Sequence, residues 1–232
     1  MDIKKIKSVI ALTIIAFIPF GLMIWIRMHQ SSGFATRELI IYPLLFGGLS
    51  ICVLYILKKY FLKEELSDFN SKSGKWYSDL GWGILLTFIY FVLFFVERST
   101  LTRLLRFNSN TELLQLMLDM REKPILLILW FGPVLWIGIA LYEELIRVFI
   151  LTSLWKWSNN IIWITKVIVF TSILIGLTHW SQGSYGIVTI AIKSLVTGIF
   201  FYKKRRLMPL VYAHVLYDGL QVAMLLLTYP EQ

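Results

Sequence analysis

Apolar blocks long enough to cross a bilayer constrain this chain more than any other feature. A transmembrane helix needs roughly 17–25 largely apolar residues, and because lipid offers no hydrogen bonds to an exposed backbone, such stretches are helical. The blocks lie at residues 9–26, 39–57, 79–96, 124–155, 161–180, 187–202 and 207–228. The sequence therefore predicts an all-α polytopic transmembrane helix bundle of about seven spans, or eight if the long fourth block is broken.

The composition excludes an ordinary soluble domain. Hydrophobic residues make up 57% of the chain and charged residues 16%, and the mean hydropathy is +0.70. The charged fraction of soluble domains is nearer ~25%. No internal repeat, proline-rich linker or low-complexity tract divides the 232 residues, which predicts a single integral membrane domain over residues 1–232 with the lipid bilayer as a partner.

Basic residues gather at the ends of the predicted spans. The formal net charge is +9, and clusters at 4–7, 58–63 and 203–206 lie on one side if every span crosses once. By the positive-inside rule this side is cytoplasmic, which predicts a cytoplasmic N-terminus and, with seven crossings, an external C-terminus. The loop 97–123 opposes this orientation because it carries several bases on the other side. Charges placed at span ends argue against a nucleic-acid partner.

The loop 97–123 is the only sizeable polar insertion. Within it the stretch S-N-T-E at 109–112 resembles a capping box, and apolar residues follow at helical spacing from Leu113 to Met120. This pattern fits an amphipathic helix on the membrane surface. A plain tether between two spans explains the segment equally well, so both interpretations stay open.

Ionisable side chains inside the predicted spans mark the candidate functional site. A charged residue at the bilayer centre costs roughly 2.5–3.5 kcal/mol on insertion scales, so such residues persist where they are paired or functional. The chain places these in its last four spans: Glu143, Glu144, Arg147, His179, Lys193, His214 and Asp218.

Two adjacent acids and an arginine share the fourth block. With about 100° between successive helical residues, Arg147 lies between Glu143 and Glu144 and neutralises only part of their charge. One acid is then tied to the arginine while the other is free for chemistry. The alternative is a salt bridge that only helps the helix to pack, although an adjacent acid pair is more than such a bridge requires.

The remaining ionisable groups lie on the three later spans. His214 and Asp218 are four residues apart and share one helical face, so Asp218 either orients the imidazole or binds a substrate together with it. A bridge from Lys193 to Asp218 is the structural explanation for that lysine. By helical rise from the loop at 158–160, His179 reaches a depth compatible with that of Glu143.

The absence of three catalytic motifs excludes several classes of active site. The chain contains no H-E-x-x-H zinc helix, no G-x-S-x-G nucleophile elbow and no G-x-G-D aspartyl signature. Carboxylates and imidazoles remain. A glutamate that activates water, a histidine that moves protons and donors that hold an oxyanion suit hydrolysis of an amide without a covalent enzyme intermediate.

At these residues the sequence resembles the CAAX-protease and bacteriocin-processing (CPBP, or Abi) family of intramembrane proteases. The matching text is E-E-L-I-R at 143–147, I-G-L-T-H at 175–179 and H-V-L-Y-D at 214–218. The resemblance covers a CPBP-like core from about 124 to 228. It implies an intramembrane endopeptidase in the plasma membrane of a prokaryote.

The resemblance also implies catalytic roles. Glu143 would be the base that activates water with His179 as its partner, while His214 and Asp218 would bind the substrate carbonyl and support the oxyanion. The substrate would be a membrane-associated peptide or protein that bears a leader or a prenyl group. His179, His214 and Glu143 are the residues that would ligate a zinc ion, but no compact ligand motif is present, which favours a metal-free reaction.

Two other classes of function compete with the peptidase. A non-catalytic protein on the same scaffold would bind a peptide or protein at the membrane, for example as a bacteriocin self-immunity factor. A transporter would relay protons through its intramembrane acids and histidines, but the two halves of the chain show no paired helices broken by glycine or proline.

The sequence departs from the family pattern at two positions. The family's structural acid–arginine pair corresponds to Glu144 and Arg147, but the family arginine usually stands one residue later, where this chain has Val148. The shift is expected to turn the guanidinium toward Glu143, where an ion pair would make that acid a weaker base. The usual phenylalanine of the second motif is replaced by Ile175.

Overall fold

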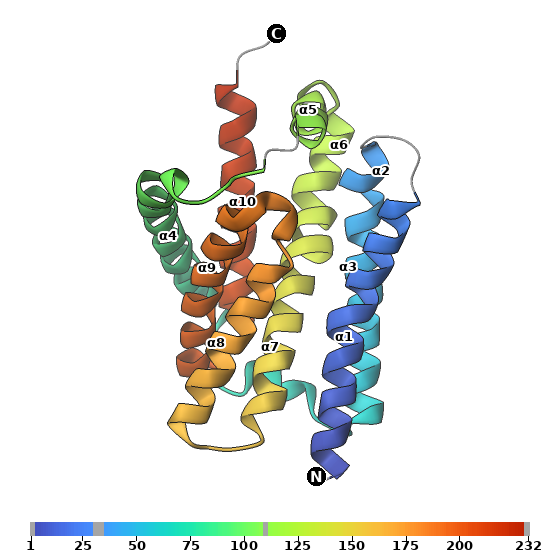
Figure 1. Cartoon of the computed structure of the whole chain (residues 1–232), viewed down its shortest axis with the longest axis vertical. Helices are drawn as coiled ribbons and strands as arrows, with labels where there is room; N and C mark the ends of the chain where they lie inside the picture. The colour runs from blue at the N-terminus through green and yellow to red at the C-terminus, as the bar shows by residue number, and fades with distance from the viewer. Residues whose placement is uncertain (1–2, 30–34, 109–110, 230–232) are drawn as a thin grey trace.

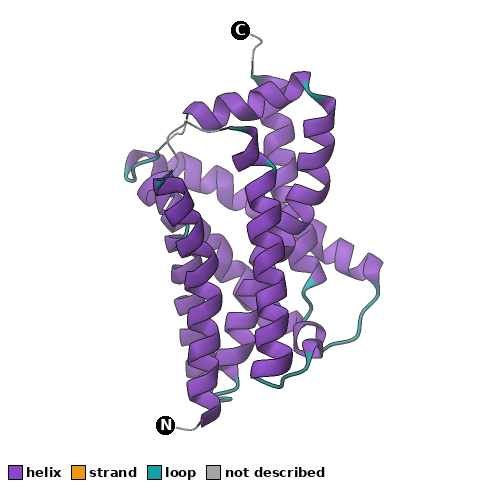
Figure 2. Ribbon diagram, turned by 90° about the vertical axis from the view of Figure 1, so that its right-hand side faces the viewer, coloured by secondary structure: helices purple, strands orange, loops and turns teal. Residues whose placement is uncertain are grey.

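The computed structural model describes residues 3–29, 35–108 and 111–229, and within these ranges the chain consists of helices, turns and loops (Figure 2). The predicted all-α class is therefore confirmed. The α-helices are α1 (Ile3–Met28), α2 (Thr36–Leu39), α3 (Ile41–Ile56), α4 (Trp76–Thr100), α5 (Thr111–Asp119), α6 (Pro124–Leu129), α7 (Tyr142–Trp155), α8 (Ile161–Leu177), α9 (Gly183–Lys204) and α10 (Met208–Thr228). The segments Leu57–Phe61 and Trp130–Leu141 are π-helical.

Long apolar helices make the chain an integral membrane protein. In the described ranges, five segments are long and apolar enough to cross a membrane: Thr36–Phe61, Trp76–Arg103, Pro124–Trp155, Trp180–Lys204 and Met208–Thr228. A shorter apolar helix is α8, which ends at Leu177 because a turn at Trp180–Gln182 reverses the chain into α9. It is therefore shorter than the predicted block 161–180.

The long helices run up and down along one axis (Figure 1). α1 leads away from the end that we call the N-terminal end, α3 returns to it, and α4 leads away again. The rod from α6 through α7 returns, α8 and α9 form a hairpin, and α10 ends at the opposite, C-terminal end. The start of α1 and the end of α10 thus lie at opposite ends of the bundle.

Ion pairs close the N-terminal end. The Lys58 ammonium is fully buried and donates to Glu64 (2.9 Å) and Asp68 (2.7 Å), and Lys156 also donates to Asp68 (2.6 Å). Partial burial raises the pKa of Asp68, but the hydrogen bonds from Lys156 and Lys58 outweigh it and lower this pKa below its ordinary value. Burial likewise lowers the pKa of Lys156, but its bonds to Asp68 and Glu64 raise it more. The α7–α8 turn is thereby tied to the segment that follows α3.

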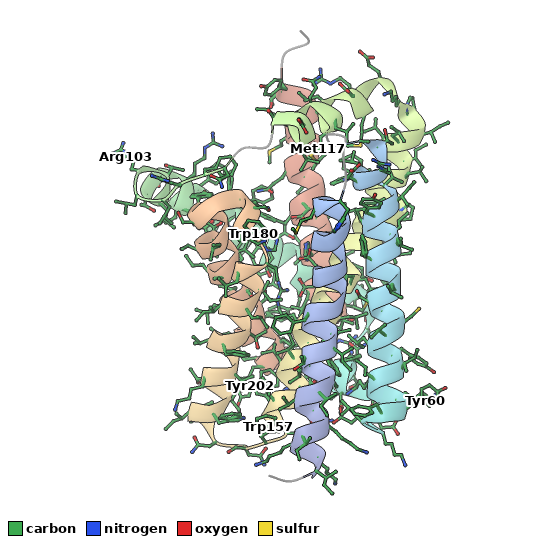
Figure 3. All side chains as sticks on the ribbon, turned by 45° about the vertical axis from the view of Figure 1, so that its right-hand side comes forward. Tyr60, Arg103, Met117, Trp157, Trp180 and Tyr202 are labelled. Atoms are coloured by element: carbon green, nitrogen blue, oxygen red, sulfur yellow. The ribbon has the colours of Figure 1, made fainter. Side chains whose placement is uncertain are left out.

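The segment predicted as the loop 97–123 is partly helical. α4 continues to Thr100, so the loop begins later than predicted. α5 packs apolar side chains such as Met117 against the core at the C-terminal end (Figure 3), and Met120 is fully buried. The predicted helix is confirmed, and protein covers part of its apolar face. Residues 109–110 of the predicted capping box lie outside the described residues.

The α8–α9 hairpin stops short of the C-terminal end. Trp180, in the turn between the two helices, lies closer to the middle of the bundle than Met117 or Arg103 (Figure 3). With 17 residues, α8 is shorter than α9, which has 22. The rim of the bundle is therefore lower on this side.

A close helix crossing leads into the acid pair. The π-helical segment Trp130–Leu141 is bent at Gly132, whose φ of −87° and ψ of −110° are not helical. A Cβ atom on Gly138 would lie 2.8 Å from the carbonyl carbon of Pro43, and one on Gly47 would lie 2.8 Å from the Cα of Gly138. Only glycines let the two backbones approach this closely. The crossing fixes where α7 begins.

Candidate active site

The acid pair occupies the first turn of α7. Glu144 is buried, and its carboxylate forms an ion pair with the Arg147 guanidinium one turn later. The Glu143 side chain is 28% exposed. Two adjacent acids thus have different surroundings: one is buried and neutralised, the other is open on one side.

The position of Arg147 corrects one expectation from the sequence. The displaced arginine was expected to turn toward Glu143, but its ion pair is with Glu144. Residues three apart on a helix are neighbours on its surface, so this spacing serves the pair as well as a spacing of four. No ion pair between Glu143 and the guanidinium is present among the described residues.

His214 of α10 lies among three carboxylates. Its Nδ1 is 2.9 Å from Glu144 Oε1, and its Nε2 is 3.2 Å from Asp218 Oδ2 and 3.9 Å from Glu143 Oε2. Because a carboxylate paired with arginine only accepts hydrogen bonds, Nδ1 is the donor to Glu144. Nε2 faces the two more exposed acids. This geometry can orient an imidazole, transfer a proton and hold a water molecule.

His179 lies apart from these acids in the described structure. It follows the end of α8, and its Nδ1 is 3.1 Å from both the Ile175 carbonyl oxygen and the Thr178 hydroxyl. Within the described ranges it makes no ion pair with a carboxylate. No hydrogen bond or ion pair joins His179 to Glu143 among the described residues, and His214 is the imidazole in contact with Glu143.

These residues do not fit a metal site. Among the described residues, no three His, Cys, Asp or Glu side chains are grouped so that they could hold a metal ion. The ligand set expected for zinc needs two imidazoles, but no contact among the described residues joins His179 to His214 or Glu143. We therefore derive no step through a metal.

Lys193 has a different partner from the one expected. Its ammonium pairs with Glu97 of α4 and not with Asp218. It also lies 5.8 Å from the ring centroid of Tyr217, which packs edge-on against the ring of Tyr90 at 5.6 Å. The aromatic pair connects the buried lysine to the helix that carries His214.

Two residues that lie beside Lys193 and Tyr217 were not predicted from the sequence. Glu97 directly follows the apolar block 79–96 and was assigned to the loop, yet it is 3% exposed inside α4. Tyr90, within the same block, bonds the Thr197 hydroxyl at 2.5 Å. The acid after an unbroken apolar block was a usable signal; nothing in the pattern distinguished Tyr90.

The surface hollow at the α7–α8 turn lies away from the acid pair. A hollow of about 240 Å³ lies at the α7–α8 turn, lined by Ser158, Asn160, Ile162, Trp163 and Lys166. This turn is at the N-terminal end, where α7 stops, whereas the acids lie at its first turn. The carboxylate–imidazole group remains the candidate site.

The comparisons with known proteins identify a family over part of the chain. Residues 125–220 match the family model described as Rce1-like, type II CAAX prenyl endopeptidase Rce1-like. The matched stretch includes all three motifs at 143–147, 175–179 and 214–218, so the family resemblance is confirmed. No curated protein and no solved structure matches the chain.

Proposed function

Because the chain carries a domain of the Rce1-like type II CAAX prenyl endopeptidase family over residues 125–220, we propose that it is an intramembrane endopeptidase. It hydrolyses a peptide bond of a membrane-associated substrate with water activated by a glutamate. The observation that carries the proposal is the His214 imidazole among Glu143, Glu144 and Asp218 inside this domain.

Glu143 is the general base. It is the half-buried member of the acid pair, and its carboxylate is free of the arginine. It takes a proton from water, whose oxygen attacks the carbonyl carbon of the substrate amide. When the C–N bond breaks, the same proton passes to the leaving nitrogen, so a carboxylic acid and an amine are the products.

His214 and Asp218 bind the substrate carbonyl and stabilise its charge. Glu144, held by Arg147, accepts the Nδ1 hydrogen of His214 and so fixes the orientation of the ring. Nε2 is directed toward the open side, where a protonated ring donates to the developing oxyanion. Asp218, 3.2 Å from Nε2, favours that protonated state. His179 is one turn beyond Ile175, and in our proposal it is the partner of Glu143 in the substrate complex.

The substrate is a peptide or protein in or at the membrane that bears a leader or a prenyl group. Glu143 and Asp218 are 28% and 32% exposed, which supports access from one side of the bundle. The family model supports a prenylated substrate. The reaction needs no metal in our proposal, and stoichiometric zinc in active preparations would contradict that part.

We further propose seven crossings, with the N-terminus in the cytoplasm of a prokaryote and the whole chain acting as one domain. The alternating directions of α1, α3, α4, the α6–α7 rod, α8, α9 and α10 support seven crossings (Figure 1). Bases at 58–63 and 203–206 follow α3 and end α9, both at the N-terminal end. That end is cytoplasmic by the positive-inside rule.

The deciding experiment compares wild type with Glu143→Ala on a library of prenylated and leader peptides in bilayers. We expect cleavage by wild type and none by the variant, with equal amounts of folded protein. Wild type that binds a peptide without cleaving any would contradict the peptidase and favour the non-catalytic binding or self-immunity protein.

A further inference from the structure

Buried hydroxyl groups in α7, α8 and α9 fall into two sets. Most satisfy themselves within their own helix: Thr152, Ser172 and Thr197 each donate to the carbonyl four residues earlier at 2.8 Å. Thr171, Ser194 and Ser153 of α7 differ, because their buried hydroxyl oxygens have no hydrogen-bond partner among the described residues. Thr171 and Ser194, which are 1% and 2% exposed, lie on the two helices that contact α7.

Arg147 has a spare donor in the same interior. Its Nη1 forms the ion pair with Glu144, whereas its Nε makes no hydrogen bond with the part of the chain that the structure describes. A guanidinium carries five N–H donors, and buried donors in folded proteins are almost always satisfied. The Nε hydrogen of Arg147 thus has no acceptor among the described residues.

Contacts between α7 and α8 place Thr171 level with Arg147. The Trp163 indole donates to the Leu154 carbonyl oxygen at 2.8 Å and fixes the register of this antiparallel pair. Thr171 lies eight residues beyond Trp163, and Arg147 lies seven residues before Leu154. At 1.5 Å per residue both are roughly 11–12 Å from this contact. At about 100° per residue, a spacing of seven ends about 20° and a spacing of eight about 80° from the starting direction, both on the same side of a helix.

Contacts of α9 place Ser194 at the same level. Phe201 stacks on Trp155 with ring centroids 5.9 Å apart; Ser194 is seven residues before Phe201, and Arg147 is eight before Trp155. On the other side, a Cβ atom on Gly198 would lie 2.9 Å from the Ile168 side chain. Ser194 and Thr171 are each about one turn from that contact, toward the same end. All three groups therefore lie at one level of the bundle, on three helices that contact one another.

We propose that Thr171 and Ser194 are positioning residues that hold Arg147 through an ordered buried water. A buried water typically makes about three hydrogen bonds, and two hydroxyls with a guanidinium provide them. The chain of contacts then runs from α8 and α9 through the water to Arg147, Glu144 and His214. Its catalytic consequence rests on the proposed peptidase function; its geometry does not.

An experimental structure that resolves ordered water tests the geometry. We expect a water density within hydrogen-bond distance of Arg147 and both hydroxyls. Hydroxyls that turn back to their own helix carbonyls, with no water between them and Arg147, would overturn the proposal. This result is independent of whether any peptide is cleaved.

Isosteric variants test the positioning role. Thr171→Val and Ser194→Ala remove one hydroxyl each and should lower kcat by about tenfold, with KM unchanged and folded protein retained. Thr171→Ser should recover most of the activity. Ser172→Ala is the matched control, because this neighbouring buried hydroxyl serves only its own helix, and it should leave kcat unchanged.

The outcomes separate the two proposals. Unchanged kcat in Thr171→Val and Ser194→Ala, while Glu143→Ala is inactive, would overturn the positioning role and leave the peptidase intact. Wild type without turnover would contradict the peptidase, and the water density would still decide the geometry. An equal loss in the Ser172→Ala control would show a general packing effect and overturn the positioning role.

Discussion

Glu143 and Glu144 are adjacent in sequence but have different environments. Only Glu144 touches Arg147, and only Glu143 keeps a partly open carboxylate. Glu143→Gln should therefore keep the fold and lower turnover by about 100-fold or more, because the amide cannot accept a proton at neutral pH. Single-turnover kinetics on folded, purified protein measure this. Activity near that of wild type would show that Glu143 is not the base.

Arg147 should act mainly on the amount of folded protein. Arg147→Ala leaves Glu144 buried without its counter-charge, which costs about 3–5 kcal/mol when one partner of a buried pair is lost. Arg147→Lys should recover only part of the lost stability, because lysine restores the positive charge but lacks the planar fork of donors. We expect the thermal unfolding temperature in detergent to fall in the order wild type, Arg147→Lys, Arg147→Ala.

A double substitution at positions 147 and 148 tests whether the spacing between Glu144 and the arginine matters. Moving the cation by Arg147→Phe with Val148→Arg restores the usual family spacing, but the Val148 side chain is fully buried. We expect this double variant to yield less folded protein than either wild type or Arg147→Lys. Normal yield with normal turnover would show that the spacing of three has no structural significance here.

At the scale of helices, a buried ion pair joins α4 to α9. Lys193 and Glu97 are 8% and 3% exposed, so removing one charge leaves the other buried without its counter-charge. Lys193→Met or Glu97→Leu alone should lower stability by about 3–5 kcal/mol, and the double variant by much less, because replacing both charges with apolar groups is often close to neutral. A double-mutant cycle by thermal unfolding measures the coupling. Additive losses would contradict the pairing.

Helices were largely predictable from the sequence, and contacts between them were not. Apolar blocks located the spans because lipid requires them, whereas the end of α4 was misplaced since Glu97 is an acid that happens to be paired. His214 was assigned to the site, but its bond to Glu144 depends on how α10 is rotated and tilted against α7. Periodicity within one helix carries no information about that rotation, which is also why Lys193 was paired with the wrong acid.

The whole molecule should lose stability at acid pH through its N-terminal end. The pKa of Asp68 is lower in the folded protein than its ordinary 3.8, so its ion pairs stabilise the fold above that pH and are lost as the pH falls through the folded value. Lys156 has a raised pKa and contributes below its ordinary 10.5, up to the point where alkaline pH discharges it. The thermal unfolding temperature, measured as a function of pH, should decline at both extremes.

A matched variant isolates that cluster. Asp68→Asn removes the shared acceptor of Lys58 and Lys156, so it should flatten the acid limb of the profile and lower stability at neutral pH. Glu65→Gln, one of the neighbouring exposed acids, is the control and should leave the profile unchanged. An acid limb that persists in Asp68→Asn would assign it to other carboxylates.

The low rim formed by the α8–α9 hairpin has a consequence for the surrounding lipid. Seventeen helical residues span about 26 Å, less than the ~30 Å thickness of a typical hydrocarbon core. In the proposed arrangement of seven crossings, we expect the bilayer beside α8 to be thinner, so that headgroups and their water lie closer to the turn that follows His179. We expect turnover to increase in bilayers with shorter acyl chains, measured in nanodiscs of graded chain length. A protein that cleaves bonds inside a membrane would in this way obtain its second substrate, water, by deforming the membrane itself.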